Sequence, residues 1–117
     1  MSSYIAGQIV IADWRDALPK EPNKLRPAIV VENDQLFDPD YANVILVPLS
    51  EDRGLAVPEL SLPLEPTPEN GCTKPCFALS YLVATTSTAR LRETNSRILP
   101  EQLDMIRRQI ALAIGLE

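Results

Sequence analysis

Two apolar segments constrain the fold of this chain more than any other feature. Residues 25–34 read LRPAIVVEND and residues 43–50 read NVILVPLS, each with polar residues at its ends. Strands that are covered on both faces have near-continuous apolar sequences of this kind. We therefore expect buried strands at about 27–32 and 43–49, in a small closed barrel with a helix or a partner packed outside.

Antiparallel pairing of these strands about a turn at residues 38–40 brings a cation and a hydroxyl to one end of the sheet. Arg26 stands at the entrance of the first strand and Ser50 at the exit of the second. A guanidinium is planar, stays charged at any working pH and binds phosphate oxygens in bidentate fashion. The pair is a candidate phosphodiester site. The alternatives are a surface arginine paired with a carboxylate and a strand-end serine that caps a turn.

The rest of the chain predicts a small β-rich domain closed by one helix. Pro100 suits a first helical position, apolar residues then recur every three or four residues, and Gly115 ends the pattern. We interpret this stripe as core or dimer packing; it comprises Leu99, Leu103, Ile106, Ile110 and Ile114. The remaining elements are a first strand at 5–13, a polar loop at 14–24, an edge strand at 60–64 and a strand at 76–83, with 85–88 as a turn or an extension. The predicted fold is mainly β with α, a small SH3-like β-barrel with a C-terminal helix.

Length and composition bound the class of protein. At 117 residues the chain is expected to form one domain, which is small enough that oligomerisation would add to its stability. No apolar run approaches the roughly 20 residues that span a bilayer, and the N-terminus lacks the pattern of a signal peptide. We expect a cytoplasmic protein with no membrane association.

Histidine is absent from the sequence, which excludes Ser-His-Asp and Cys-His nucleophilic chemistry. Cys72 and Cys76 form a Cys-x3-Cys pair with no histidine to complete a zinc site. We interpret them as two ordinary thiols of a reducing compartment. The alternatives are a redox pair or half of an intermolecular metal site. No cofactor or metal is expected.

The net charge of −5 argues against broad affinity for nucleic acids, which depends on cations that displace counterions. A local cationic patch is still compatible with this charge, because several cations fall near the candidate site in sequence. The alternative is that they only solvate loops. These cations are Arg15, Lys20, Lys24, Arg26 and Arg53.

Several of these motifs, at their spacing, resemble the MazF/PemK family of toxin endoribonucleases. The resemblance runs from GQIVIAD at 7–13, through Arg26-Pro27 and the Asn33-Asp34 pair, to LPEQL at 99–103. It implies a CcdB/MazF-type barrel, a single toxin domain over residues 1–117 and a homodimer. It also implies metal-independent cleavage of single-stranded mRNA, in which the 2′-hydroxyl attacks the phosphate to give a 2′,3′-cyclic phosphate.

The resemblance also implies roles for individual residues. Arg26 matches the catalytic arginine of the family, and Ser50 falls where the family usually has a catalytic threonine. Glu21 matches an acidic loop residue. The family's Gln-x-Arg element is replaced here by Tyr-Leu-Val-Ala-Thr at 81–85. The residues expected to bind substrate are Glu21, Lys24, Arg15, Lys20, Arg53 and Thr85, with Trp14, Tyr41 and Tyr81 as possible stacking platforms or core residues.

Three functions follow as hypotheses. The first is a sequence-selective endoribonuclease toxin that a cognate antitoxin inhibits, with an acidic antitoxin tail that mimics RNA phosphate near Arg26. The second is a CcdB-like toxin that binds and poisons a host enzyme such as gyrase. The third is a noncatalytic SH3-like interaction module, for which the Pro-rich segment 58–75 is a ligand.

Overall fold

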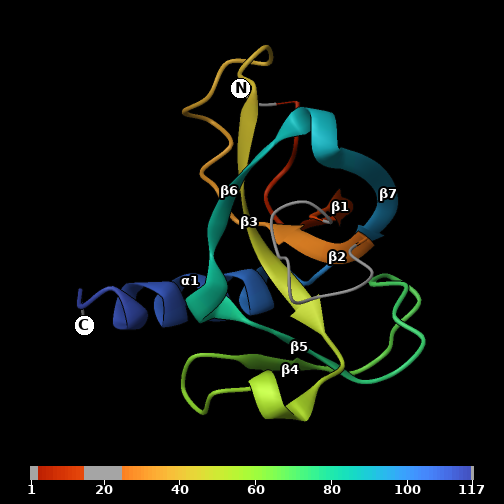
Figure 1. The fold of residues 1–117 in the computed structure, drawn as a ribbon, viewed down its shortest axis with the longest axis vertical. Coiled ribbons are helices and arrows are strands. Elements are labelled where there is room, and N and C mark those ends of the chain that lie inside the picture. The colour runs from red at the N-terminus through yellow and green to blue at the C-terminus, as the bar shows by residue number, and fades with distance from the viewer. Residues whose placement is uncertain (1–2, 15–24, 117) are drawn as a thin grey trace.

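The computed structural model describes residues 3–14 and 25–116, and in this part the chain forms a barrel-like antiparallel sheet with one C-terminal α-helix (Figure 1). The fold is mainly β, as predicted. Its strands are β1 (Gln8–Asp13), β2 (Leu25–Val30), β3 (Asn43–Ser50), β4 (Leu62–Leu64), β5 (Cys76–Ala78), β6 (Ala84–Ser87) and β7 (Leu91–Arg97). The helix is α1 (Pro100–Ala113), and the short 3-10 helices are η1 (Arg53–Leu55), η2 (Ser80–Leu82) and η3 (Thr88–Arg90).

The strands follow the order β4-β5-β3-β2-β1-β7, and β6 pairs with β3. As expected, β2 and β3 are antiparallel neighbours, with Ala28 opposite Pro48 and Val30 opposite Leu46. The hydrogen-bonded path over the described residues has β4 and β7 as its two ends. The barrel-like fold is thus confirmed, although the sheet is open where a closed barrel was expected.

The central strands bury both of their faces, because alternate side chains of a strand point to opposite sides. Ile29 and Val47 belong to one apolar cluster, whereas Ala28 and Leu46 belong to another. All four are completely buried. This arrangement explains why the sequences of β2 and β3 are apolar almost without interruption.

Helix α1 covers the first of these clusters. Ile106 is fully buried there, and Leu103 and Ile110 pack against it. The guanidinium of Arg107 donates from Nε to the Val31 carbonyl (3.0 Å) and from Nη2 to the Glu32 carbonyl (2.8 Å), which ties the helix to the end of β2. Since burial drives helix docking, this face fixes where the helix lies.

The ends of the predicted helical stripe do not join the core. Leu99, at the N-cap, is 48% exposed, and Ile114, at the C-cap, is 64% exposed. Both lie beyond the turns that face the sheet. Gly115 does end the helix, with φ of 87°, and the amides of Gly115 and Leu116 bond back to the Leu112 and Ala111 carbonyls in a Schellman arrangement.

One strand prediction needs correction. The strand predicted at 76–83 is interrupted: Leu49 of β3 lies opposite Ala78, but Leu46 lies opposite Ala84, so the neighbouring chain has three extra residues, which form η2. The segment 84–87 is then a strand, one of the two options predicted for that region.

Strand β7 was not expected from the sequence at all. It pairs with β1, with Val10 opposite Glu93, and its inner side chains include Thr94, whose hydroxyl donates to the Ile9 carbonyl. Its sequence LRETNSR is polar because it lies at an end of the sheet with much of its surface exposed.

No helix in the described part of the chain is long and apolar enough to cross a bilayer.

Candidate functional site

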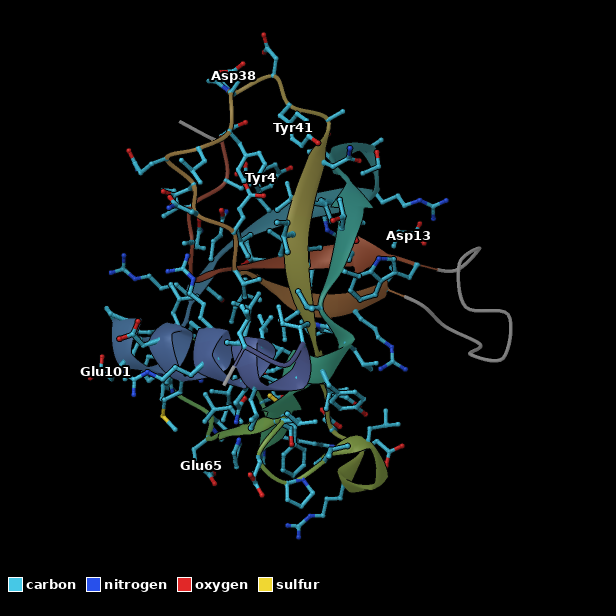
Figure 2. The ribbon with its side chains drawn as sticks, turned by 90° about the vertical axis from the view of Figure 1, so that its left-hand side faces the viewer. Tyr4, Asp13, Asp38, Tyr41, Glu65 and Glu101 are labelled. Carbon is cyan, nitrogen blue, oxygen red and sulfur yellow. The ribbon has the colours of Figure 1, made fainter. Side chains whose placement is uncertain are left out.

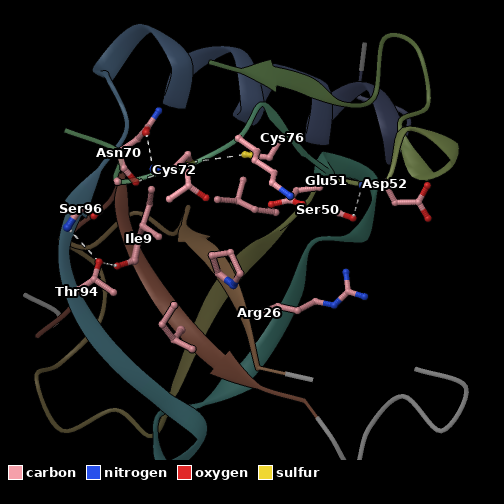
Figure 3. Close-up of a pocket in the computed structure, with 16 residues that line it drawn as sticks. Ile9, Arg26, Ser50, Glu51, Asp52, Asn70, Cys72, Cys76, Thr94 and Ser96 are labelled. Carbon is pink, nitrogen blue, oxygen red and sulfur yellow. Dashed lines mark hydrogen bonds between the residues drawn. The ribbon is translucent and has the colours of Figure 1, made fainter. Parts of the chain in front are cut away.

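Arg26 and Ser50 lie on adjacent strands, on the end of the sheet away from the β2–β3 loop. Ala28 lies opposite Pro48, and Arg26 and Ser50 are two residues further along their strands in the same direction. Both side chains are half-buried and both line one cleft of about 570 Å³, which we call the central cleft (Figure 3). The sequence-based expectation that these residues share one end of the sheet is therefore confirmed.

A fixed turn holds Ser50 at the end of β3. Its Oγ accepts a hydrogen bond from the Asp52 amide (3.1 Å), and Asp52 Oδ1 accepts one from the Gly54 amide (2.8 Å) at the start of η1. Because Oγ uses a lone pair in the first bond, its own hydrogen remains available to donate into the cleft. Ser50 is therefore oriented as a hydroxyl donor.

The segment between β4 and β5 forms the opposite wall of the central cleft. Asn70, which is 4% exposed, organises this wall: its Oδ1 accepts from the amides of Thr67 (3.0 Å) and Cys72 (2.9 Å), and its Nδ2 donates to the Glu65 carbonyl (2.8 Å). Lys74 also lines the cleft from this segment. The cleft thus combines two cationic side chains, Arg26 and Lys74, with the Ser50 hydroxyl.

Arg26 also borders a second cleft of about 450 Å³, which we call the tryptophan cleft. Trp14 lines it, and the indole Nε1 donates to Thr86 Oγ1 (3.0 Å). Arg90 lies there as well, with Nη1 donating to the Asp13 carbonyl (3.1 Å). Arg26 therefore lines both clefts from its position on β2.

The other predicted site residues are not gathered at the central cleft. Thr85 is exposed on β6 and lines the tryptophan cleft instead. Arg53 is exposed in η1 and is not among the described residues that line either cleft. Both were expected to bind substrate, and neither is among the residues that line the central cleft with Ser50. Arg15, Lys20, Glu21 and Lys24 fall outside the described residues.

Two of the three aromatic residues considered for stacking, Tyr81 and Tyr41, line neither cleft. Tyr81, in η2, donates its hydroxyl to the Leu55 carbonyl (2.6 Å). Tyr41 is 50% exposed and contacts Phe37, with ring centroids 5.4 Å apart, in the loop that joins β2 to β3 (Figure 2). That loop lies at the end of the sheet away from Arg26. Trp14 alone of the three lines a cleft beside Arg26.

The Asn33-Asp34 pair, part of the motif noted in the sequence, has a structural position. It follows β2 at the end away from Arg26, where Asp34 Oδ2 accepts from the Ala6 amide (2.7 Å) and Asn33 Oδ1 accepts from the Gln35 amide (3.1 Å). The bond from the Ala6 amide, followed by the bond that Gln35 Nε2 donates to Asp34 Oδ1 (3.0 Å), lowers the pKa of Asp34. Asp34 therefore fastens the N-terminal segment to the end of β2, whereas Asn33 holds the loop that follows.

Several cleft residues escaped the sequence analysis. Lys74 lies in a Pro-rich stretch, and Thr94 and Ser96 belong to the unexpected strand β7. The only local signal for β7 is the alternation that places Thr94 and Ser96 on one side. Among the described residues no group of three or more His, Cys, Asp or Glu side chains is arranged to hold a metal ion.

The fold and the cleft together define a class of protein: a small barrel-like β domain with one C-terminal helix and a cationic cleft at the end of its central strands. A family model described as the PemK-like, MazF-like toxin of type II toxin-antitoxin systems matches residues 5–114. The chain belongs to this toxin family. No curated protein sequence matches the chain closely enough to count as a relative.

Solved structures support the same fold. The Mycobacterium tuberculosis toxin MazF-mt6 is similar with a TM-score of 0.72 and 22% identity, over 94% of this chain and 98% of that one. An endoribonuclease in complex with its cognate antitoxin, from a mycobacterial species, gives a TM-score of 0.74 and 19% identity over 98% of both chains. A MazE–MazF structure from Deinococcus radiodurans gives 0.68 and 14% identity over 97% of both. At these identities the likeness concerns the fold.

Proposed function

We propose that this toxin is a metal-independent endoribonuclease that cleaves single-stranded mRNA at selected sequences. The observation that carries the proposal is that Arg26 and Ser50 line one cleft from adjacent strands. Family membership supports it, as do similar solved structures of mycobacterial endoribonucleases. The catalytic unit is the single domain that residues 1–117 form.

The chemistry requires that the scissile phosphate be held while the adjacent 2′-hydroxyl attacks it in line. Charge builds on the phosphoryl oxygens during this attack, and a guanidinium stabilises that charge through paired N–H donors. Arg26 has this role. Ser50 donates its hydroxyl hydrogen to a phosphoryl oxygen, because Oγ already accepts from the Asp52 amide. As the bond from the 2′-oxygen to phosphorus forms, the bond from phosphorus to the 5′-oxygen breaks. The 5′-oxygen takes a proton from solvent, so the products are a 2′,3′-cyclic phosphate and a 5′-hydroxyl.

Lys74 and Glu51 complete the proposed site from the residues that line the cleft. Lys74 supplies a second cation for the RNA backbone, in keeping with the weight of phosphate contacts in RNA binding. Glu51 follows Ser50 directly and is the carboxylate we assign to accept the 2′-hydroxyl proton, since Asp52 Oδ1 is engaged by the Gly54 amide. Glu51→Gln should therefore lower the cleavage rate, because an amide cannot accept this proton.

The partners of this function are a cognate antitoxin, single-stranded RNA and a second copy of the chain. An acidic antitoxin tail that occupies the central cleft would place carboxylates against Arg26 and exclude RNA phosphate. The substrate, mRNA, locates the activity in the cytoplasm. Co-expression with the product of the neighbouring gene should relieve growth inhibition by the toxin.

The test is cleavage of a long single-stranded RNA by the purified protein in the presence of a chelator, with new ends mapped by primer extension. Arg26→Ala should reduce the cleavage rate by about 100-fold or more, the usual effect of removing one donor to a developing oxyanion. Arg53→Ala is the matched control, because it removes the same charge outside both clefts. Ser50→Ala should also lower the rate, and Ser50→Thr should retain activity.

Discrete cuts with cyclic-phosphate ends that disappear in Arg26→Ala, but not in Arg53→Ala, would support the proposal. Equal activity of the two variants would show that the cationic cleft does not do the chemistry. Absence of cleavage by the wild-type protein at every concentration, with growth inhibition intact, would favour the CcdB-like alternative of a toxin that poisons a host enzyme.

A further inference from the structure

Two thiols face each other in the wall of the central cleft. The Sγ atoms of Cys72 and Cys76 are 3.7 Å apart, and Figure 3 shows the pair on the side of the cleft opposite Arg26. Both cysteines are free thiols. The sequence leaves open whether they are ordinary thiols, a redox pair or half of a metal site. A sulfur–sulfur contact of this kind is close to the approach that thiol oxidation requires.

Each of the two cysteines is held in place by its own contacts. Cys76 belongs to β5, where it pairs with Leu64 of β4, and its side chain is 6% exposed within the first apolar cluster. Cys72 is held through its amide, which donates to the buried Asn70 Oδ1 (2.9 Å). Each anchor is independent of the other, so the separation of the thiols is set by the fold rather than by the three intervening residues alone.

The residue between Asn70 and Cys72 requires glycine. Gly71 has φ of 66°, and a Cβ at this position would lie 2.5 Å from Ser96 Oγ of β7. The backbone can thus turn Cys72 toward β5 only because this position has no side chain. The turn that brings the thiols together is therefore built into the local sequence.

The two cysteines differ in access. Both cysteines line the cleft, but Cys72 is half-buried whereas Cys76 is only 6% exposed, so Cys72 is the more accessible thiol. Burial, followed by the proximity of Cys72, raises the pKa of the Cys76 thiol to about 12. Thiolate is the reactive form of cysteine, so Cys76 is unsuited to react first. The arrangement has a partly exposed attacking thiol beside a buried resolving thiol.

We propose that Cys72 and Cys76 form an oxidation site, at which a hydroperoxide converts the two thiols into an intramolecular disulfide across the wall of the central cleft. This modification goes beyond the proposed cleavage of RNA and does not depend on it. A reducing compartment would keep the pair as thiols at rest, and the disulfide would form during exposure to oxidant.

The reaction balances in two steps. The Cys72 thiolate attacks one oxygen of hydrogen peroxide, the O–O bond breaks, and the departing hydroxide takes a proton to become water, leaving a sulfenic acid on Cys72. The Cys76 sulfur then attacks the Cys72 sulfur, the S–O bond breaks, and the departing hydroxide takes the Cys76 proton as a second water. Two thiols are oxidised by two electrons and one peroxide is reduced.

The modification acts on the cleft because the mobile partner must be Cys72. A disulfide bond is about 2 Å long, shorter than the present contact of 3.7 Å, and Cys76 is fixed in the β4–β5 ladder. Oxidation therefore draws Cys72 toward β5 and fixes the wall next to Lys74. Thiol reduction reverses the change.

The test treats the reduced full-length protein with hydrogen peroxide, blocks remaining thiols with an alkylating reagent, and records intact mass, peptide maps and non-reducing gels. The wild-type protein should lose both thiols together, gain a cross-link between the peptides that contain Cys72 and Cys76, remain a monomeric band, and recover both thiols with dithiothreitol. In Cys76→Ser the remaining Cys72 should react at least about 10-fold faster than Cys76 does in Cys72→Ser. Cys76→Ala, checked with the others by circular dichroism, serves where the serine disturbs the core.

Three outcomes would overturn the proposal. The first is that both thiols of the wild-type protein are still alkylated after treatment with an amount of oxidant that consumes Cys72 in the Cys76→Ser variant. The second is a bridge between two chains in place of the intramolecular one. The third is faster oxidation of Cys76 than of Cys72 in the folded single variants. None of these readouts involves RNA, so loss of the oxidation site and loss of the proposed nuclease activity are separately visible.

Discussion

Replacing Asn70 by alanine tests whether one buried side chain holds the wall of the central cleft. Asn70 is 4% exposed and its side chain makes three hydrogen bonds to backbone groups: it accepts from the amides of Thr67 and Cys72 and donates to the Glu65 carbonyl. All three join residues of the same segment. The alanine variant removes every one of them while leaving the strands untouched.

The expected cost follows from these contacts. Removing one partner of a hydrogen bond leaves the other partner unsatisfied or poorly solvated and lowers the free energy of unfolding by about 1 kcal/mol. The loss of three such bonds lowers it by about 3 kcal/mol. Water reaches part of this segment, because Thr67 and Glu65 are exposed, so we expect the free energy of unfolding to fall by about 2–3 kcal/mol. For a domain of this size the Tm should fall by about 10 °C.

The assay is thermal unfolding followed by circular dichroism, repeated by urea titration. The matched control is Asn95→Ala, an exposed asparagine on β7, which should change the Tm by less than about 2 °C. Equal melting temperatures for Asn70→Ala and the wild-type protein would refute the argument, because they would show that the three hydrogen bonds contribute nothing net to stability.

Two further changes probe the core and the N-terminal fastening. Ile106→Ala, at a fully buried position of α1, should cost about 3–4 kcal/mol in urea unfolding, whereas Met105→Ala, 49% exposed, should cost less than about 1 kcal/mol; similar costs would contradict the docking of α1. The pKa of Asp34 in the folded protein lies below its ordinary value, so the folded protein binds this proton less readily than the unfolded chain does. The ionised carboxylate therefore stabilises the fold. This stabilisation is complete above about pH 4 and is lost as the pH falls through the lowered pKa. Asp34→Asn should therefore be less stable than the wild-type protein by less than about 1 kcal/mol at neutral pH, a small effect because solvent screens the site, and the difference should shrink in acid; a difference that grows in acid would reverse the sign of this linkage.

The apolar periodicity of the chain predicted its central elements well. Both faces are buried from Ala28 to Val30 in β2 and over most of β3, and the predicted antiparallel pairing brings Arg26 and Ser50 to one end. Pro100 begins α1 and Gly115 ends it, as local chemistry requires. These features depend on burial pattern and backbone preference, which are written in neighbouring residues.

Other predictions failed where long-range contacts decide. The polar sequence of β7 forms a strand because β1 offers it hydrogen-bond partners. The strand predicted at 76–83 is interrupted by η2, whose Ser80 Oγ donates to Gln109 Oε1 of α1 (2.7 Å), a contact between residues far apart in sequence.

The sequence by itself thus determined the β-rich class, the helix with its ends and the pairing that joins Arg26 to Ser50. Only the tertiary structure decided which other side chains share their cleft. It excluded Arg53, added Lys74 and Asn70, and placed Cys72 against Cys76. The physical reason is that secondary structure follows from periodicity and local backbone preference, whereas a cleft is made by segments that meet only when the apolar clusters form.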